Sequence, residues 1–332
     1  MRAILEALSS WLDVGESIAL ATVVWTEGSS PRPLGSRMAV TDSGKMVGSV
    51  SGGCVEGDVF QEARRVLAER EARRLHYGAV EGGGWQVGLA CGGKIDVYVE
   101  PLVDIHRLLV QALQRDETVG LATRLDGEGH LLAWADGRLR GDRSLAPQLT
   151  SFVGASEFPW STAELTRCAE GEVFLEVFAR PSTLTIIGAV HIAQPLVAMA
   201  QLLGFHVRLV DARRTFATRE RFPDVDELVI AWPQDGLVPE TLRPRDAVVI
   251  LTHDPKFDVP ALEAVLRSPV GYVGLLGSTA TQDRRQKALR ELGFGEQDLT
   301  RIHGPVGLDI GGRRPEEIAL AIMAQIVAVR NE

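Results

Sequence analysis

The sequence predicts an α/β protein of two domains: a mixed α+β domain at residues 1–179, then a doubly wound parallel sheet at residues 180–332. Three observations lead to this prediction. The chain has 332 residues, more than one hydrophobic core usually supports. Beyond residue 180, apolar strands alternate with helical segments, which is typical of a parallel sheet covered by helices. Between the two patterns lies "ARPSTL" (179–184), whose proline and small polar residues indicate a boundary.

Composition excludes several classes of partner and location. The chain is 45% hydrophobic and 24% charged, as in ordinary globular proteins. A net charge of −9 argues against nucleic acid or an anionic membrane surface as the main partner. The three cysteines show no disulfide or metal-ligand spacing, and no apolar stretch approaches the ~20 residues of a membrane span. We therefore expect a cytoplasmic protein without stable membrane insertion.

The elements of the first domain follow from periodicity, in chain order. "MRAILEALSSWLDVG" has the apolar spacing of a helix, and "SIALATVVW" has the pattern of a strand. "SRMAVTDSGKMVGSV" predicts two strands joined by a turn at residues 42–44, and a helix begins near Val55. "KIDVYVEPL" predicts a further strand. A helix at about residues 102–113, a hairpin through "TRLDGEGHLLAW" and the strand "VFLEVFA" complete the domain.

The second domain contains five predicted strands, "LTIIG", "HVRLVD", "ELVIAW", "AVVILTHD" and "GYVGLLG". Ligands of such sheets bind beyond the carboxyl ends of the strands. We therefore expect a binding edge made of Gly188, His191, Asp211, Thr252, His253, Asp254, Gly277 and Ser278. A final helix should begin at Pro315, after a glycine-rich loop with Arg301 and Asp309 that we expect to fold over a ligand.

"IIGAVHIAQPL" resembles the opening of a dinucleotide-binding motif, and Asp211 ends the next strand near the expected offset of ~20 residues. Val190, however, stands where a glycine normally lets the backbone approach a pyrophosphate. A turn that only packs is therefore the favoured interpretation. An NAD(P)-dependent oxidoreductase, with Asp211 on the ribose and His253 as acid or base, is kept as the alternative function.

The most informative segment is "GSVSGGCVEGDVF", residues 48–60, which places Cys54 between glycines and the start of a helix. A thiolate is favoured near the positive end of a helix dipole, and the glycines expose backbone amides to an anion. "GLACGGK" presents Cys91 in a similar way. Both thiols are predicted to be functional, although a free cysteine is often only a small buried hydrophobe. "SSPRPLGSRM" adds Arg32 and Arg37, which suit an anion or form a solvated loop.

Six motifs in order, "EGSSPRPLGSRM", "GSVSGGCVEGDV", "CGGKIDVYVEP", "LTHDPKFD", "GLLGS" and "RIHGPVGLDIGGRRPEEIA", resemble the XdhC/CoxI family. The resemblance implies an N-terminal XdhC/CoxI domain and a C-terminal Rossmann-like domain. It also implies an accessory protein that binds molybdenum cofactor (molybdopterin). Such a protein supports sulfuration of the cofactor alongside a cysteine desulfurase and delivers it to an apo molybdenum hydroxylase such as xanthine dehydrogenase.

Residues and resemblance together predict a maturation chaperone more than a turnover enzyme, working as a homodimer. A docking adaptor that binds no small molecule is a third interpretation. Cys54 and Cys91 are the predicted chemically active residues, and Cys54 is the predicted metal ligand. The expected cofactor-binding residues of the first domain are Arg32, Arg37, Gly52, Gly53, Cys54, Glu56, Cys91, Gly92, Gly93 and Lys94.

Overall fold

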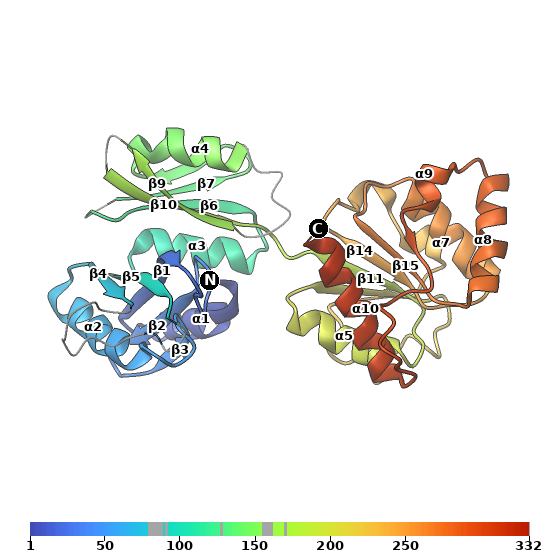
Figure 1. Cartoon of the computed structure of the whole chain (residues 1–332), viewed down its shortest axis with the longest axis horizontal. Helices are drawn as coiled ribbons and strands as arrows, with labels where there is room; N and C mark the ends of the chain where they lie inside the picture. Colours follow the sequence, from blue (N-terminus) through green and yellow to red (C-terminus); the bar gives the residue numbers. More distant parts are fainter. Residues whose placement is uncertain (79–88, 90–91, 127–128, 155–161, 169–170, 332) are drawn as a thin grey trace. The chain divides into compact units, whose positions relative to one another are not determined.

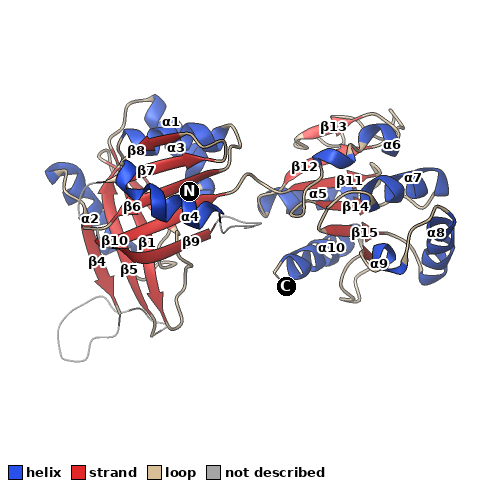
Figure 2. Cartoon of the chain, turned by 90° about the horizontal axis from the view of Figure 1, so that it is seen from above, coloured by secondary structure: helices blue, strands red, loops and turns tan. Residues whose placement is uncertain are grey.

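The structure, a computed structural model, describes residues 1–78, 89, 92–126, 129–154, 162–168 and 171–331. It divides into two compact units, Met1–Arg180 and Pro181–Glu332 (Figures 1 and 2). The first unit is built on antiparallel sheets and the second on a parallel sheet, so the predicted fold class is confirmed. None of the helices in the described part of the chain has the length and apolar content that crossing a bilayer requires.

Sheet A of the first unit is antiparallel, with the strand order β3-β2-β1-β5-β4. Its strands are β1 (Ile18–Glu27), β2 (Arg37–Thr41), β3 (Met46–Gly48), β4 (Arg73–Tyr77) and β5 (Lys94–Pro101). Helix α2 (Glu56–Glu69) covers one face of this sheet with Val59, Ala63 and Val66, which are fully buried. These three residues have the helical spacing that predicts α2 from the sequence.

Sheet B of the first unit is also antiparallel, with the order β8-β7-β6-β10-β9. Its strands are β6 (Val119–Arg124), β7 (His130–Trp134), β8 (Leu139–Gly141), β9 (Thr162–Cys168) and β10 (Gly171–Phe178). The remaining helices of the unit are η1 (Arg2–Ile4), α1 (Leu5–Asp13), α3 (Asp104–Gln114), η2 (Arg143–Leu145) and α4 (Ala146–Gly154). Helix α4 packs on sheet B, whereas α1 packs on sheet A and α3 contacts both α1 and sheet B.

The two sheets of this unit share a small apolar cluster. Val24 and Tyr98 of sheet A contact Phe174 of sheet B and Leu125, which follows β6. Tyr98 and Glu100 lie two residues apart on β5 and therefore point to the same face of sheet A. This places Glu100 on the side of sheet A that faces sheet B.

Sheet C of the second unit is wholly parallel, with the order β13-β12-β11-β14-β15-β16. Its strands are β11 (Thr183–Ile187), β12 (His206–Val210), β13 (Glu227–Val229), β14 (Ala247–Ile250), β15 (Tyr272–Leu275) and β16 (Ile302–His303). Its helices are α5 (Ala193–Leu202), α6 (Pro233–Gly236), η3 (Pro239–Thr241), α7 (Pro255–Leu266), α8 (Thr279–Glu291), α9 (Glu296–Leu299) and α10 (Pro315–Arg330). Helices α5 and α10 pack on one face and α7 and α8 on the other, as in a doubly wound sheet.

Candidate functional site

Three of the motifs singled out in the sequence emerge at one end of sheet A. Strand β1 ends at Glu27, which pairs with Lys94 at the start of the antiparallel β5. Strand β3 ends at Gly48, which pairs with Met38 near the start of β2. The loop after β1, the turn after β3 and the segment before β5 therefore leave the sheet on the same side. This end of sheet A carries Arg32, the glycine–cysteine turn Ser49–Cys54, and Gly92–Lys94.

Glu56 holds the glycine–cysteine turn in shape by accepting hydrogen bonds from its backbone amides and hydroxyls. Its carboxylate accepts hydrogen bonds from the backbone amides of Ser51 (2.8 Å), Gly52 (3.0 Å) and Gly53 (2.7 Å). The hydroxyls of Ser49 and Ser51 donate to the same carboxylate at 2.7 and 2.6 Å. The turn is an anion-binding site, as expected from its glycines, but the anion is part of the chain. Gly52, Gly53 and Glu56, which we expect to bind the cofactor, are thus already bonded to one another, and their direct contact with the cofactor stays a prediction.

Electrostatics agrees with this internal role of Glu56. Burial acts to raise the pKa of the carboxyl, but the hydrogen bonds from Ser51 and Ser49 outweigh it and lower the pKa to about 2. Glu56 is therefore ionised throughout the neutral range. Gly52 and Gly53 have φ values of +79° and +119°, a region in which side chains are strained, so this turn requires glycine for its backbone shape.

Cys54 keeps its thiol exposed at the edge of this turn. Helix α2 has Val55 as its N-cap, one residue later than expected, so Cys54 directly precedes the cap. The side chain is not sealed in apolar packing and lies within reach of a ligand in solvent. Cys91, the second predicted functional thiol, lies outside the described residues. Cys168 is partly buried, and its thiol donates to the Gly171 carbonyl at 3.4 Å.

Arg37, which we expect to bind an anion, is bonded in the structure to a carboxylate of the chain itself. Its side chain is buried, and its guanidinium forms a double contact with Glu176 of β10, at 2.8 and 2.5 Å. Paired guanidinium and carboxylate groups of this kind neutralise each other inside a protein. Arg37 is thus a structural residue that joins sheet A to sheet B.

Two cations at this end of sheet A remain exposed. Arg32 lies in the solvent-exposed part of the loop after β1. Lys94 pairs with Glu27 at 2.8 Å, with both side chains at least half exposed, and such surface pairs exchange partners at little energetic cost. Gly93 has a packing explanation that the sequence did not suggest: an added Cβ would lie 2.4 Å from the Ser29 carbonyl oxygen. Gly92 is exposed at a φ of +74°.

At the carboxyl edge of sheet C, the Asp211 carboxylate accepts hydrogen bonds from other groups of the chain. Its carboxylate accepts from the Ala189 amide at 2.8 Å and from the Arg213 backbone amide and side chain at 2.7–2.9 Å. Burial acts to raise the pKa of Asp211, but the bonds from Arg213 and Ala189 outweigh it and hold the pKa below its ordinary value. A ribose would have to displace these partners. The structure therefore gives no support to NAD(P) binding through Asp211.

The residues of "LTHDPKFD" divide between structural and exposed positions. Thr252 is buried and donates its hydroxyl to Asp258, which is fully buried and paired with Arg285. Asp254, expected to bind cofactor, is instead the N-cap of α7 and accepts from the Lys256 amide at 3.0 Å. His253 is exposed at the end of the strand and stays available to a ligand.

Of the remaining predicted residues of the second unit, three have a structural explanation and three are exposed. An added Cβ at Gly188 would lie 2.8 Å from the Thr252 methyl group, and one at Gly277 would lie 2.8 Å from Arg285. Arg301 donates to three main-chain carbonyls, those of Leu266, Ser268 and Val270, and so holds the chain together instead of covering a ligand. His191, Ser278 and Asp309 are exposed.

Comparison with protein families matches both units. The profile of the XdhC and CoxI family matches residues 11–78, and the profile of the XdhC Rossmann domain matches residues 184–326. The chain belongs to the XdhC and CoxI family.

Relatives of this XdhC family member match along nearly all of its length. It is 28% identical to a probable xanthine dehydrogenase subunit of Bacillus subtilis, over 98% of this chain and 96% of that protein. It is 29% identical to the molybdenum cofactor insertion chaperone PaoD of Escherichia coli, over 99% of this chain and 87% of that protein. A crystal structure described as a xanthine dehydrogenase from Bacillus halodurans superposes with a TM-score of 0.81 at 26% identity, covering 99% of this chain and 96% of that one.

One cluster of this XdhC chain was missed by sequence reasoning. Glu100, His106 and His130 converge in the first unit, with potential ligand atoms all within 4.8 Å of one another. Burial acts to raise the pKa of Glu100, but the imidazoles of His106 and His130 outweigh it and hold the pKa well below its ordinary value. The sequence contained one signal, a glutamate in the otherwise apolar strand "KIDVYVEPL". Its histidine partners were not recognisable, because neither forms a known ligand spacing with it.

Proposed function

We propose that this chain binds molybdenum cofactor, supports its sulfuration, and inserts it into an apo molybdenum hydroxylase of the xanthine dehydrogenase type. The names of two relatives support this role, since one is a molybdenum cofactor insertion chaperone and the other a probable xanthine dehydrogenase subunit. The observation that carries the proposal is the exposed thiol of Cys54, at the same end of sheet A as the exposed cations Arg32 and Lys94.

The proposed division of labour follows from chemistry. A thiolate is a soft ligand, suited to molybdenum or to a transferable sulfur, so Cys54 contacts the metal-bearing part of the cargo. Arg32 and Lys94 neutralise the phosphate of the pterin. Glu56 acts indirectly by holding the turn that presents Cys54. Cys91 is proposed as a second contact on the strength of its sequence context alone.

Partners and assembly belong to the same proposal. A cysteine desulfurase supplies the sulfur, and the chain works as a homodimer in the cytoplasm.

The test is cofactor retention and transfer without oxygen. The full chain is supplied with molybdenum cofactor, and bound pterin is measured by fluorescence after oxidation, together with molybdenum content. We expect near-stoichiometric cofactor on the wild type and at least a tenfold loss in Cys54→Ser, with a matching loss in activation of apo xanthine dehydrogenase.

Cys168→Ser is the matched control, since its thiol is partly buried and donates to the nearby Gly171 carbonyl. It should behave as the wild type. Equal retention and transfer by Cys54→Ser and wild type would remove Cys54 from the mechanism. Absence of cofactor from the wild type would favour the docking adaptor instead.

A further inference from the structure

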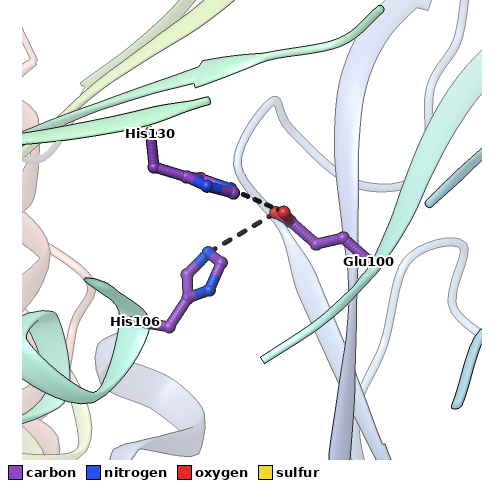
Figure 3. Close-up of side chains that lie close together, drawn as sticks. All are labelled: Glu100, His106 and His130. Carbon is purple, nitrogen blue, oxygen red and sulfur yellow. Dashed lines mark hydrogen bonds and ion pairs between the residues drawn. The ribbon is translucent and has the colours of Figure 1, made fainter. Parts of the chain in front are cut away.

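We propose that Glu100, His106 and His130 form a binding site for a divalent metal ion of the zinc type, beside a pocket in the first unit (Figure 3). This site is separate from the glycine–cysteine turn and does not depend on the cofactor role proposed above. Two imidazoles and one carboxylate are a ligand set that zinc commonly takes in proteins.

The three side chains come from three elements and meet at one point. Glu100 lies near the end of β5 in sheet A, His106 in the first turn of α3, and His130 at the start of β7 in sheet B. His130 Nε2 lies 2.6 Å from one carboxylate oxygen of Glu100, and His106 Nε2 lies 3.5 Å from the other. Figure 3 shows both rings directed at the carboxylate. Tetrahedral bonds of about 2.0–2.2 Å place ligand atoms about 3.4 Å apart, so a metal requires shifts of about an ångström that widen the shortest of these separations and narrow the longest.

Charge balance favours a cation at this point. Glu100 and His106 are buried, with exposed fractions of 6% and 1%. Within the described part of the chain, Glu100 forms its ion pairs with the two histidines, and no lysine or arginine is paired with it. An ionised carboxylate in such surroundings needs a compensating positive charge. A bound divalent ion supplies this charge.

Metal binding by His106 must change the hydrogen bond that its ring forms with the backbone of Val103. Its Nδ1 accepts a hydrogen bond from the Val103 amide at 3.2 Å, so the ring proton lies on Nε2, which faces Glu100. Coordination through Nε2 moves that proton to Nδ1, where the Val103 amide no longer finds an acceptor. The Val103 amide is therefore a local reporter of metal binding by His106.

The adjoining pocket makes the site open to solvent molecules or a ligand. It has a volume of about 750 Å³, and Glu100 and His130 both contribute to its wall, together with Tyr98 and Asp126. Three protein ligands with access on the remaining side are typical of exchange-competent zinc sites, whereas structural sites are closed by four protein ligands. We therefore infer a site that accepts a fourth ligand from the pocket.

The experiment titrates the full-length, metal-free chain with Co²⁺ and then displaces it with Zn²⁺. The Cys54→Ser background removes the exposed thiol as a competing ligand. We expect one equivalent of Co²⁺ with the intense visible absorption of a four- or five-coordinate ion. Affinity should fall at least tenfold in Glu100→Gln and in His130→Ala. His76→Ala is the matched control, because His76 also contacts a carboxylate of sheet A, Asp96 at 2.7 Å, outside the cluster.

A second measurement uses the wild-type ligands only, so it does not depend on whether the variants fold. Addition of Zn²⁺ should shift the Val103 amide resonance and speed its hydrogen exchange. The proposal is overturned if the folded protein binds no Co²⁺ at this site, if His76→Ala loses as much affinity as the cluster variants, or if the Val103 amide stays unchanged at saturation. Because the Cys54→Ser background is used throughout, failure here leaves the proposed cofactor role untouched.

Discussion

At the scale of single residues, Cys54 and Glu56 are two positions apart and do different work. The Glu56 carboxylate accepts hydrogen bonds from four consecutive backbone amides, those of residues 50–53, and from two hydroxyls, while the Cys54 thiol stays exposed. The glycines between Ser51 and Cys54 adopt the positive φ values that the turn requires. A side chain on a turn that is held by its own hydrogen bonds is fixed in advance, so less entropy is lost when such a side chain binds a ligand.

Replacing Glu56 by Gln should destabilise the chain by about 1–3 kcal/mol at neutral pH, because charged acceptors strengthen the hydrogen bonds to the turn. The sign with pH follows from the lowered pKa. The folded-state pKa of about 2 lies below the ordinary value of 4.5, so the stabilisation is complete above about 4.5 and is lost as the pH falls toward 2. Urea unfolding of both proteins from pH 7 to pH 2 measures this. A stability difference independent of pH would contradict it.

The sequence predicts a cofactor anion at the glycine–cysteine turn, and in the structure the Glu56 carboxylate is bonded to these amides. Glycines before a helix predict exposed backbone amides. The carboxylate that accepts their hydrogen bonds belongs to Glu56, only a few residues further along the chain. A capping carboxylate near such a turn was therefore a readable alternative to an external phosphate. For Arg37 the partner is 139 residues away, and no local pattern connects the two.

At the scale of elements, most helices and strands follow from periodicity, whereas strand pairing in the first unit does not. The apolar run in "SIALATVVW" predicts β1, but nothing local says that β1 lies between β2 and β5. Strands β4, β8, β9 and β16 and helix α4 were not predicted. The parallel sheet was easier, since alternating strands and helices leave few possible arrangements.

Substitution of Arg37 tests the ion pair that connects β2 of sheet A with β10 of sheet B. Arg37→Leu should lower the free energy of unfolding by about 3–5 kcal/mol, because it leaves Glu176 buried without its partner. The double variant Arg37→Leu/Glu176→Leu should recover most of that loss, since no charge is then left unpaired. Urea denaturation of the three proteins gives the comparison. If Arg37→Leu instead has the same free energy of unfolding as the wild type and only cofactor retention falls, the result supports the predicted role of Arg37 in binding an anion of the cofactor.

At the scale of the whole molecule, the two units each have substantial cores. Leu20, Leu109 and Phe174 are fully buried within the first unit, and Ile186 and Val249 within the second. Cores of this kind are what an independently folding domain requires.

Residues 1–180, expressed alone, should therefore fold. We expect a cooperative urea transition, because the buried clusters of this unit lie within its own sequence. Circular dichroism through the transition is the measurement, with the full-length chain as reference. A gradual loss of signal without a transition would show that the first unit needs the second in order to fold.

The contact between Arg37 and Glu176 also bears on synthesis. At about 5–20 residues per second, the ribosome needs on the order of ten seconds to add the residues that separate them. During that interval the nascent chain contains Arg37, which is buried in the folded protein, but does not yet contain its partner Glu176. The N-terminal part of the protein can thus complete its interior only after its last strand has left the exit tunnel.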